Sequence, residues 1–536
     1  ATAATTITAA LCALSFDNFQ TFWRKLLESC VAVAERFCEY AVQVRSAVTE
    51  VPGGLGSAEA SSGTQARSSR SDGDPAGELL RLFEVMMNSF LQKVGALLQA
   101  RQNEHKALKV CDWKPLLAST NESLDKVKAL QENCKRRLSA TEIAVGDVRG
   151  GIRAILYSQT KLIIEEFHQS RLAQMQCVLE QERWDRTDVP APYKAILEKL
   201  VGHEEKSEGG DGEQQVDRFL RCDSANFLVV PAVLTLIQLL ADYVSLCREL
   251  DNLAAEIVQR IVLLLRLFLQ QMHKLVLGGQ AVQKKVLQKI SAANLALCSQ
   301  TCGLVAQILP KMQAHLLVIL NAEPGTASTS APGRHVGAAL VGDLTQVATD
   351  YSECRSALFA KISTILRDRY DFHAKKWLSE PHQEIKDSVA WCESVDANPK
   401  EVSLNPHSAL DGLVKDITSM YRVLLKNLSG DSVRRIFAKA FEEIAAKFEK
   451  RLGEELSSPS PPYSESVGFS LGDRLIMDVA FVQEQLERLS GIAQPLQRLF
   501  FDLAHHLQTR LPGDDPLKAL HPSVLEVLQR TGRLPR

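Results

Sequence analysis

Residues 275–290 read LVLGGQAVQKKVLQKI, an apolar run followed by a glycine pair and a lysine-rich stretch. The same order of residues is found in loops that bind nucleotide phosphates. Neither GxxxxGK[ST] nor GxGxxG is present, however, and no strand pattern precedes the glycines. The stretch therefore indicates a turn between two helices rather than a nucleotide site, and no cofactor is expected there.

The flanking sequence predicts the two helices that this turn joins. Helical periodicity extends over residues 251–276, after an Asp-Asn pair that favours a helix start. We predict that Gly278 ends this helix with a positive φ, as residues after a helix terminus often do. A second, antiparallel helix is predicted over residues 280–315, kinked at Pro310.

Two groups of basic residues are candidate interaction surfaces. Three lysines lie off the apolar line of the second predicted helix, and three more basic residues lie on the helical segment RRIFAKAFEEIAAKFEKRL, residues 434–452. On the latter segment three glutamates dilute the positive charge, so core packing of its apolar side is favoured over membrane contact. The candidates are Lys284, Lys285 and Lys289, and Arg434, Arg435 and Lys439.

Helical periodicity dominates the chain, and alternating strand patterns are almost absent. Near the N-terminus it predicts one apolar stripe, and a later long helix should end at the prolines of VPAP, residues 189–192. Long helices with little strand predict an all-α fold of serial helical bundles that form an elongated rod. The predicted stripe consists of Phe22, Leu26, Cys30, Val33 and Phe37.

Four polar segments rich in small residues interrupt the helices, and their composition cannot build a core. We use three of them as boundaries. The predicted parts are a helical segment at 1–52, a flexible insertion at 53–77, the first bundle continued at 78–202, an acidic linker at 203–215, a second bundle at 216–321, a flexible linker at 322–336, and C-terminal bundles at 337–536.

Composition excludes several classes of protein. Lys plus Arg number 62 and Asp plus Glu 64, so no global field selects nucleic acid. The 12 cysteines are scattered through apolar helical patterns, which is typical of a cytosolic chain rather than a disulfide framework. The most apolar windows, residues 227–244 and 261–272, fall short of a membrane helix and are predicted to be buried helices.

No catalytic or metal site is predicted. Residues 468–472 read GFSLG and match the GxSxG nucleophile motif at Ser470, but no strand precedes the serine. Cys298 and Cys302 share one helical face without further ligands at a recognised spacing, so they are predicted to be buried structural residues. Two glutamate pairs, at 165–166 and 442–443, are predicted to be solvated faces.

Three apolar segments resemble one known family. FHQSRLAQMQCVLEQERWDRTDVPAPYKAIL (167–197), KLVLGGQAVQKKVLQKISAANLALCSQ (274–300) and LIMDVAFVQEQLERLSGI (475–492) are similar, in this order, to segments of the vacuolar protein sorting-associated protein 54 family. That family is a subunit of the Golgi-associated retrograde protein tether, and the chain resembles its C-terminal two-thirds. At Val286 the sequence departs from the family, where a glycine is expected.

The resemblance implies a non-enzymatic tethering subunit. It would act at the cytosolic face of trans-Golgi network and endosome membranes, as a peripheral protein in retrograde transport. The implied partners are the sister subunits of the complex, bound mainly through the family's N-terminal coiled coil, together with SNAREs and the endosomal or Golgi membrane surface.

Two alternatives stay open at the level of sequence. One is a helical adaptor or small-GTPase effector of another tethering complex, similar to syndetin or exocyst subunits. The other is a hydrolase that uses Ser470.

Overall fold

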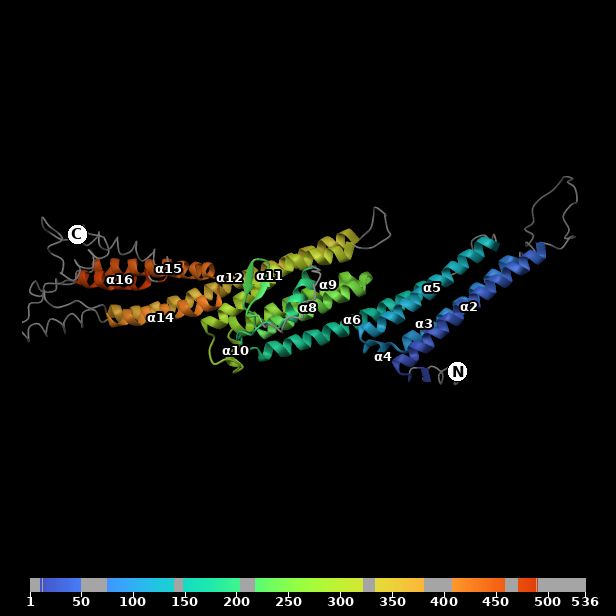
Figure 1. Ribbon diagram of the computed structural model, residues 1–536, viewed down its shortest axis with the longest axis horizontal. Coiled ribbons are helices and arrows are strands. Elements are labelled where there is room, and N and C mark those ends of the chain that lie inside the picture. The colour runs from blue at the N-terminus through green and yellow to red at the C-terminus, as the bar shows by residue number, and fades with distance from the viewer. Residues whose placement is uncertain are drawn as a thin grey trace, which may run out of the picture. The chain divides into compact units, whose positions relative to one another are not determined.

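The computed structural model describes residues 10–11, 13–49, 75–138, 148–202, 217–321, 333–379, 407–457, 471–487 and 489 (Figure 1). Within these residues the regular secondary structure is helical apart from one short hairpin and two isolated bridges, which confirms the all-α prediction. The chain divides into two compact units, Ala1–Ala173 and Gln174–Arg536, described separately below. The sevenfold division proposed above stays a prediction, because most of the linker residues lie outside the described residues; of the predicted linkers, residues 75–77 are the start of α3 and residues 333–336 the start of α12.

Unit 1 is a bundle of long helices, and apolar side chains of its described residues are buried in three clusters. Its helices are α2 (Phe16–Thr49), α3 (Pro75–Ala100), α4 (Gln102–Lys106), α5 (Val110–Leu138) and the first part of α6 (Val148–Gln181).

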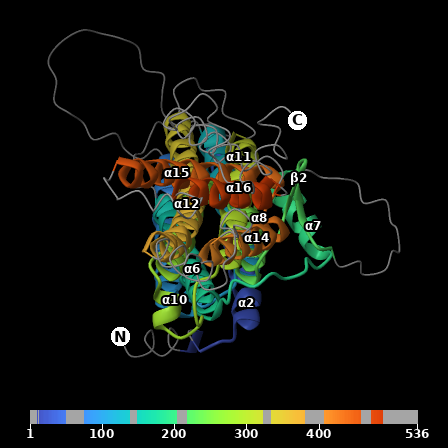
Figure 2. The same cartoon turned by 90° about the vertical axis from the view of Figure 1, so that its left-hand side faces the viewer.

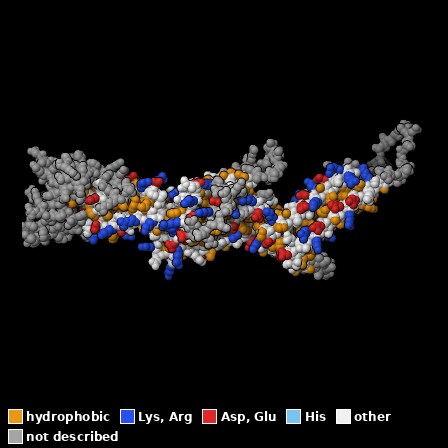
Figure 3. All heavy atoms as spheres, viewed as in Figure 1, with side chains coloured by type: hydrophobic (Ala, Val, Ile, Leu, Met, Phe, Trp, Pro, Cys, Tyr) orange, Lys and Arg blue, Asp and Glu red, His pale blue; other side chains and the backbone are white. Residues whose placement is uncertain are grey.

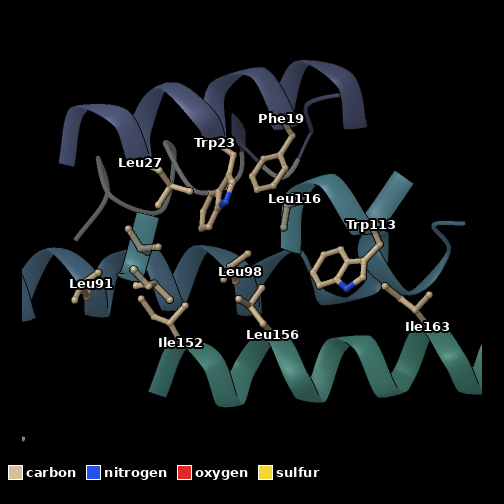
Figure 4. Close-up of a cluster of buried hydrophobic side chains, with 12 residues drawn as sticks. Phe19, Trp23, Leu27, Leu91, Leu98, Trp113, Leu116, Ile152, Leu156 and Ile163 are labelled. Atoms are coloured by element: carbon tan, nitrogen blue, oxygen red, sulfur yellow. The ribbon is translucent and has the colours of Figure 1, made fainter. Parts of the chain in front are cut away.

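The apolar stripe of α2 differs from the predicted one. Cys30 is buried as expected, but Val33 is 50% exposed, so the predicted row is wrong at that position. Helix α5 packs closely on α2 and covers the neighbouring row of side chains, which repeats at the same three- and four-residue spacing (Figure 4). The buried row is Phe19, Trp23, Leu27, Cys30, Ala34 and Ala41.

Two buried tryptophans tie the helices of unit 1 together through their indole nitrogens. Trp23 Nε1 donates to Thr120 Oγ1 at 2.8 Å, which links α2 to α5. Trp113 Nε1 donates to Thr160 Oγ1 at 2.9 Å, which links α5 to α6. Because a buried indole N–H needs an acceptor, these bonds fix the positions of the rings that Figure 4 shows in the core.

His105 is fully buried in the same core, between the rings of Phe19 and Trp113. Its Nδ1 lies 3.0 Å from Gln159 Oε1. Burial lowers the pKa of His105, and the positive charge of Arg101 lowers it further, against the opposing effects of Gln159 and Glu104.

We expect unit 1 to lose stability as pH falls below about 6.5, the ordinary pKa of an unfolded histidine. The unfolded state then binds a proton that folded His105 does not, so the unfolding free energy falls by up to about 1.4 kcal/mol per pH unit. Hydrogen exchange of α2 and α5 amides between pH 7.5 and 5 measures this. His105→Gln should flatten the dependence, whereas the same change at the exposed His273 should leave it intact.

Unit 2 contains the remaining elements of the described chain. They are α7 (Pro192–Val201), β1 (Leu220–Cys222), β2 (Ala225–Phe227), α8 (Pro231–Glu249), η1 (Asp251–Leu253), α9 (Ala254–Met272), the π-helical turn η2 (His273–Leu277), α10 (Gln280–Gln283), α11 (Ala292–Asn321), α12 (Gly333–Ser379), α14 (Ser408–Asn427), α15 (Gly430–Ser457) and α16 (Leu471–Glu487).

The two most apolar windows form buried helices, as predicted. Helix α8 begins at Pro231, whose fixed φ suits the first helical turn, and α9 follows it through the short η1. The pair packs with α11, and α11 in turn packs along α12, which also contacts α14 and α15 (Figures 1 and 2). By length and composition alone α8 and α11 could cross a membrane, but 61% of the α8 window is buried inside the unit.

Helix α6 ends earlier than predicted. Its last helical residue is Gln181, so the proline segment 189–192 does not terminate it. Residues 182–190 lie outside any helix and include two isolated bridges, Thr187 with Val229 and Val189 with Asp217. Pro192 then begins α7. The antiparallel hairpin of β1 and β2 was also missed, because strands of three residues are too short to show alternation.

The glycine pair does form a turn, but its geometry differs from the prediction. Gly278 has φ −78°, and Gly279, with φ 72°, is the left-handed residue. The second helix does not run continuously over 280–315, because α10 ends at Gln283 and α11 starts at Ala292. It restarts there because Ser291 and Asn294 cap it reciprocally: Ser291 N donates to Asn294 Oδ1 at 3.0 Å, and Asn294 N to Ser291 Oγ at 3.2 Å.

The two glycines should tolerate substitution differently. A Cβ at Gly278 would lie 2.7 Å from the backbone oxygen of Lys274, whereas a Cβ at Gly279 meets no atom within 4 Å. Gly279→Ala should therefore cost about 1–2 kcal/mol of unfolding free energy through its backbone conformation, and Gly279→Asn less. At position 278 both substitutions should be damaging, because the clash is steric. Urea unfolding tests this, and equal rescue by Asn at both positions would contradict it.

Candidate interaction surfaces and their buried supports

The three predicted lysines lie at an exposed loop between α10 and α11. Lys284, Lys285 and Lys289 are all exposed, and Lys285 has a positive φ of 60°. Lys284 Nζ lies 3.7 Å from Glu180 Oε1 on α6, an exposed pair that contributes little stability. Val282, on the adjoining helix α10, has 37% of its surface exposed, so an apolar side chain lies close in sequence to the positive charges.

The C-terminal end of this lysine loop is fixed by Asn294. Its Nδ2 donates to the carbonyl oxygens of Arg183 and Trp184, at 3.3 Å and 3.2 Å. Its Oδ1 meanwhile accepts from Ser291. One buried amide therefore joins the start of α11 to the segment that follows α6, and it holds the end of the lysine loop in place.

Glu182 joins that same segment to α8. It is 5% exposed, and its carboxylate accepts from Trp184 N and Ala232 N, each at 2.8 Å. Burial raises the pKa of Glu182, and the backbone hydrogen bonds oppose that rise. Trp184, fully buried at φ 55°, turns the chain so that both donors reach one carboxylate. Glu182 thus caps the N-terminus of α8 from a distant part of the sequence.

Asp478 plays a similar part at the other end of unit 2. It is fully buried on α16, and it accepts from Trp377 Nε1 at 2.7 Å and from His407 N at 2.8 Å. His407 Nδ1 in turn accepts from Ala409 N at 3.1 Å and caps α14. Three helices, α12, α14 and α16, therefore meet at one carboxylate.

The second basic surface lies on α15. Arg434, Arg435 and Lys439 are exposed, and Arg434 forms an ion pair with Asp431. The opposite side of this helix is core, because Ile436, Ala440 and Ile444 are buried, as predicted. On the face seen in Figure 3, basic and acidic side chains are interspersed over the described residues. The basic groups are therefore local features of a mixed surface.

None of the candidate catalytic or metal-binding residues forms a chemical site in the described residues. Cys298 and Cys302 are fully buried, which confirms the prediction, and burial raises the pKa of Cys298 well above its usual range. In the described residues no group of three or more His, Cys, Asp or Glu side chains could hold a metal ion. Ser470 of the GxSxG motif lies outside those residues.

The glutamate pairs were predicted to lie on solvated faces, and one member of each pair is partly exposed and forms an ion pair with a basic residue. Glu166 pairs with Lys106 at 3.2 Å, and Glu443 pairs with Arg367 at the same distance. These are partly exposed ion pairs between helices. They are of the kind that contributes about 0–1 kcal/mol each.

A family described as Vps54-like protein matches residues 224–369. This stretch holds α8, the glycine pair, the lysine loop and Asn294. The resemblance inferred from three sequence segments is thereby confirmed.

Relatives in several organisms carry the same name. Human vacuolar protein sorting-associated protein 54 is 23% identical over 356 residues, which are 66% of this chain and 32% of the human protein. The Arabidopsis thaliana protein of that name, called chloroplastic, is 24% identical over 397 residues, 60% of this chain and 36% of the relative. The Drosophila melanogaster protein is 30% identical over 174 residues, 31% of this chain and 18% of the relative. The chain thus spans about a third of the length of the first two, and no solved structure matches it.

The buried supports were not predicted from sequence, although each lies in one of the three segments that carry the resemblance. Glu182 belongs to the ERW triplet, Asn294 to NLAL and Asp478 to DVAF. The serine three residues before Asn294 is a readable helix-start signal, whereas an acid within an apolar run gives no indication of its distant partner.

Proposed function

We propose that this Vps54-like chain is a non-enzymatic subunit of a multisubunit vesicle tether. It acts in retrograde transport from endosomes to the trans-Golgi network, as a peripheral protein on the cytosolic face of those membranes, and promotes SNARE-dependent fusion. The match of residues 224–369 carries this proposal, supported by the relatives named vacuolar protein sorting-associated protein 54.

The fold suits binding better than catalysis. Its long helices are held at their ends by buried polar groups, and its basic groups lie on exposed loops and faces. A tether needs stiff elements that present such surfaces to other proteins and to membranes. The proposed partners are the sister subunits of the Golgi-associated retrograde protein complex, SNAREs and the endosomal or Golgi membrane.

Co-purification tests the assembly part of this proposal. The chain, joined to the N-terminal region of its relatives, should recover the three sister subunits when all are expressed together. Recovery of none of them would reject the tether subunit. Recovery of a GTP-loaded small GTPase in their place would support the effector alternative.

The lysine loop is the surface that we assign to membrane contact. Three ammonium groups beside the exposed Val282 combine charge with an apolar side chain, which favours an anionic lipid surface. We expect charge reversal of all three residues to weaken binding to phosphatidylserine-containing vesicles at least about tenfold. Co-sedimentation of the full chain with vesicles, with and without phosphatidylserine, measures this. The substitutions are Lys284→Glu, Lys285→Glu and Lys289→Glu.

A matched control carries the same change in net charge at three exposed lysines elsewhere in unit 2. Lys199→Glu, Lys361→Glu and Lys426→Glu should leave vesicle binding within about twofold, because these residues lie on separate helices. Equal losses in both triple variants would show that only total charge matters, and would remove the loop from the proposal.

A further inference from the structure

Two cysteines of unit 1 face each other across the interface of α2 and α5. Cys134 on α5 is 2% exposed, and Cys38 on α2 packs against it beside the buried Ala41. The Cys38 thiol donates to the backbone oxygen of Leu130 at 3.8 Å, one helical turn before Cys134. Small side chains at this point of α2 let the two helices approach closely, and α2 contacts α5 more extensively than any other pair in the unit.

The two thiols differ in how readily they lose a proton. The neighbouring Cys38 thiol lowers the pKa of Cys134, and the positive charge of Arg137 lowers it further, while burial acts in the opposite sense. The interaction between the two thiols, together with burial, raises the pKa of Cys38. By contrast, burial raises the pKa of Cys30, two turns earlier on α2, to about 11. We therefore take Cys134 as the attacking thiol of the pair, because the positive charge of Arg137 favours its thiolate.

We propose that Cys38 and Cys134 form an oxidation site that reacts with hydroperoxides and closes a disulfide between α2 and α5. The Cys134 thiolate attacks a peroxide oxygen and becomes a sulfenic acid, and the O–O bond breaks to release water after protonation. The Cys38 thiol then attacks the sulfenic sulfur, forms the S–S bond and releases a second water. Two thiols lose two electrons, and one hydrogen peroxide is reduced to two waters.

Access distinguishes this pair from a second one in unit 2. Cys302 on α11 and Cys354 on α12 also interact, and a hydrogen bond from Cys302 lowers the pKa of Cys354. Cys302 is fully buried and Cys354 is 8% exposed, whereas Cys38 is partly exposed at the helix interface. A peroxide in solution can therefore reach the pair in unit 1 from the side of Cys38, which packs beside the buried Cys134, whereas both thiols of the pair in unit 2 are buried.

The test treats the folded full chain with hydrogen peroxide, blocks the remaining thiols, and maps tryptic peptides by mass spectrometry. Cys38 and Cys134 fall in separate peptides, FCEYAVQVR and ALQENCK, each with one cysteine. We expect these two peptides to become linked, with the linkage reversed by dithiothreitol. The amides of α2 and α5 in the oxidised chain should then exchange at least about tenfold more slowly.

Three variants complete the design. Cys38→Ser should leave Cys134 as a sulfenic acid that dimedone traps, whereas Cys134→Ser should abolish both the linkage and the dimedone adduct. Cys30→Ser is the matched control on α2 and should change neither. Cys302 and Cys354 should stay alkylatable after denaturation over the same period.

Two results would overturn the proposal. In one, Cys38 and Cys134 remain fully alkylatable while the exposed Cys111 or Cys177 is oxidised. In the other, Cys134 proceeds to sulfinic acid without any linked peptide, which would mean that Cys38 cannot reach it. Since each readout is a peptide mass, failure of the proposed tethering function would not affect the outcome.

Discussion

Replacing Glu182 with alanine is expected to lower the unfolding free energy of unit 2 by about 3–5 kcal/mol. The carboxylate accepts from the buried amides of Trp184 and Ala232, and alanine leaves both donors without a partner. Each unsatisfied buried donor costs about 1–3 kcal/mol, and the cap of α8 is lost with them. Urea unfolding followed by circular dichroism measures the loss, and hydrogen exchange at Ala232 locates it.

Two further variants make this expectation specific. Glu182→Gln retains one acceptor oxygen and removes the cost of burying a charge, so it should lose less than the alanine variant. Glu180→Ala, two residues earlier on α6, removes an exposed carboxylate and should change the unfolding free energy by less than about 0.5 kcal/mol. If Glu180→Ala were as damaging as Glu182→Ala, the assigned role of the buried carboxylate would be wrong.

Asp478→Ala should cost a similar amount, about 3–5 kcal/mol, at the other end of unit 2. It would leave the indole N–H of Trp377 and the amide of His407 without their carboxylate acceptor, inside a region with no exposed surface at Asp478. Because three helices meet there, the loss should be seen in α12, α14 and α16 together. Hydrogen exchange across these helices, beside a urea titration, is the measurement.

The isosteric variant Asp478→Asn separates hydrogen bonding from packing. Its one acceptor oxygen can serve Trp377 or His407 but not both, and its NH2 group would face the other donor. We therefore expect a loss of at least about 1–3 kcal/mol even though the side-chain volume is unchanged. Asp368→Ala on the exposed side of α12 is the control, with an expected change below about 0.5 kcal/mol. An Asp478→Asn protein as stable as the parent would mean that packing alone holds α12, α14 and α16 together.

Much of the fold was readable from local patterns. The periodicity of residues 227–244 and 261–272 predicted buried helices, because each segment carries its own apolar spacing. The predictions failed where a distant contact chose between local possibilities. On α2 the predicted three- and four-residue spacing was right, but the predicted row of buried side chains was wrong at Val33. Helix α5 covers the row that contains Trp23 instead.

Helix ends were the least predictable features. The prolines at 190 and 192 predict the end of the preceding helix, yet α6 already ends at Gln181. Glu182, the next residue, caps α8 instead. The predicted helix over 280–315 likewise breaks, because Asn294 bonds to the backbone of Arg183 and Trp184. In both cases the partner lies at least 50 residues away in the sequence, so a local pattern gives no indication of it.

The candidate surfaces illustrate the same division. Exposure of Lys284, Lys285 and Lys289 followed from their place off the apolar line, although the helix on which that line was drawn is a loop in this segment. What they bind stays a prediction, since charged residues confer solubility and recognition with the same atoms.

The sequence by itself determined the helical class, the buried character of the apolar helices, the turn at the glycine pair and the resemblance to the Vps54-like family, whose model matches residues 224–369. Each of these rests on spacing between neighbours in the chain. Only the tertiary structure decided that Glu182, Asn294 and Asp478 are buried joints, and that Cys38 meets Cys134. A hydrogen bond or a thiol contact between distant segments depends on how whole helices pack, and that arrangement is a property of the folded chain rather than of any one stretch of it.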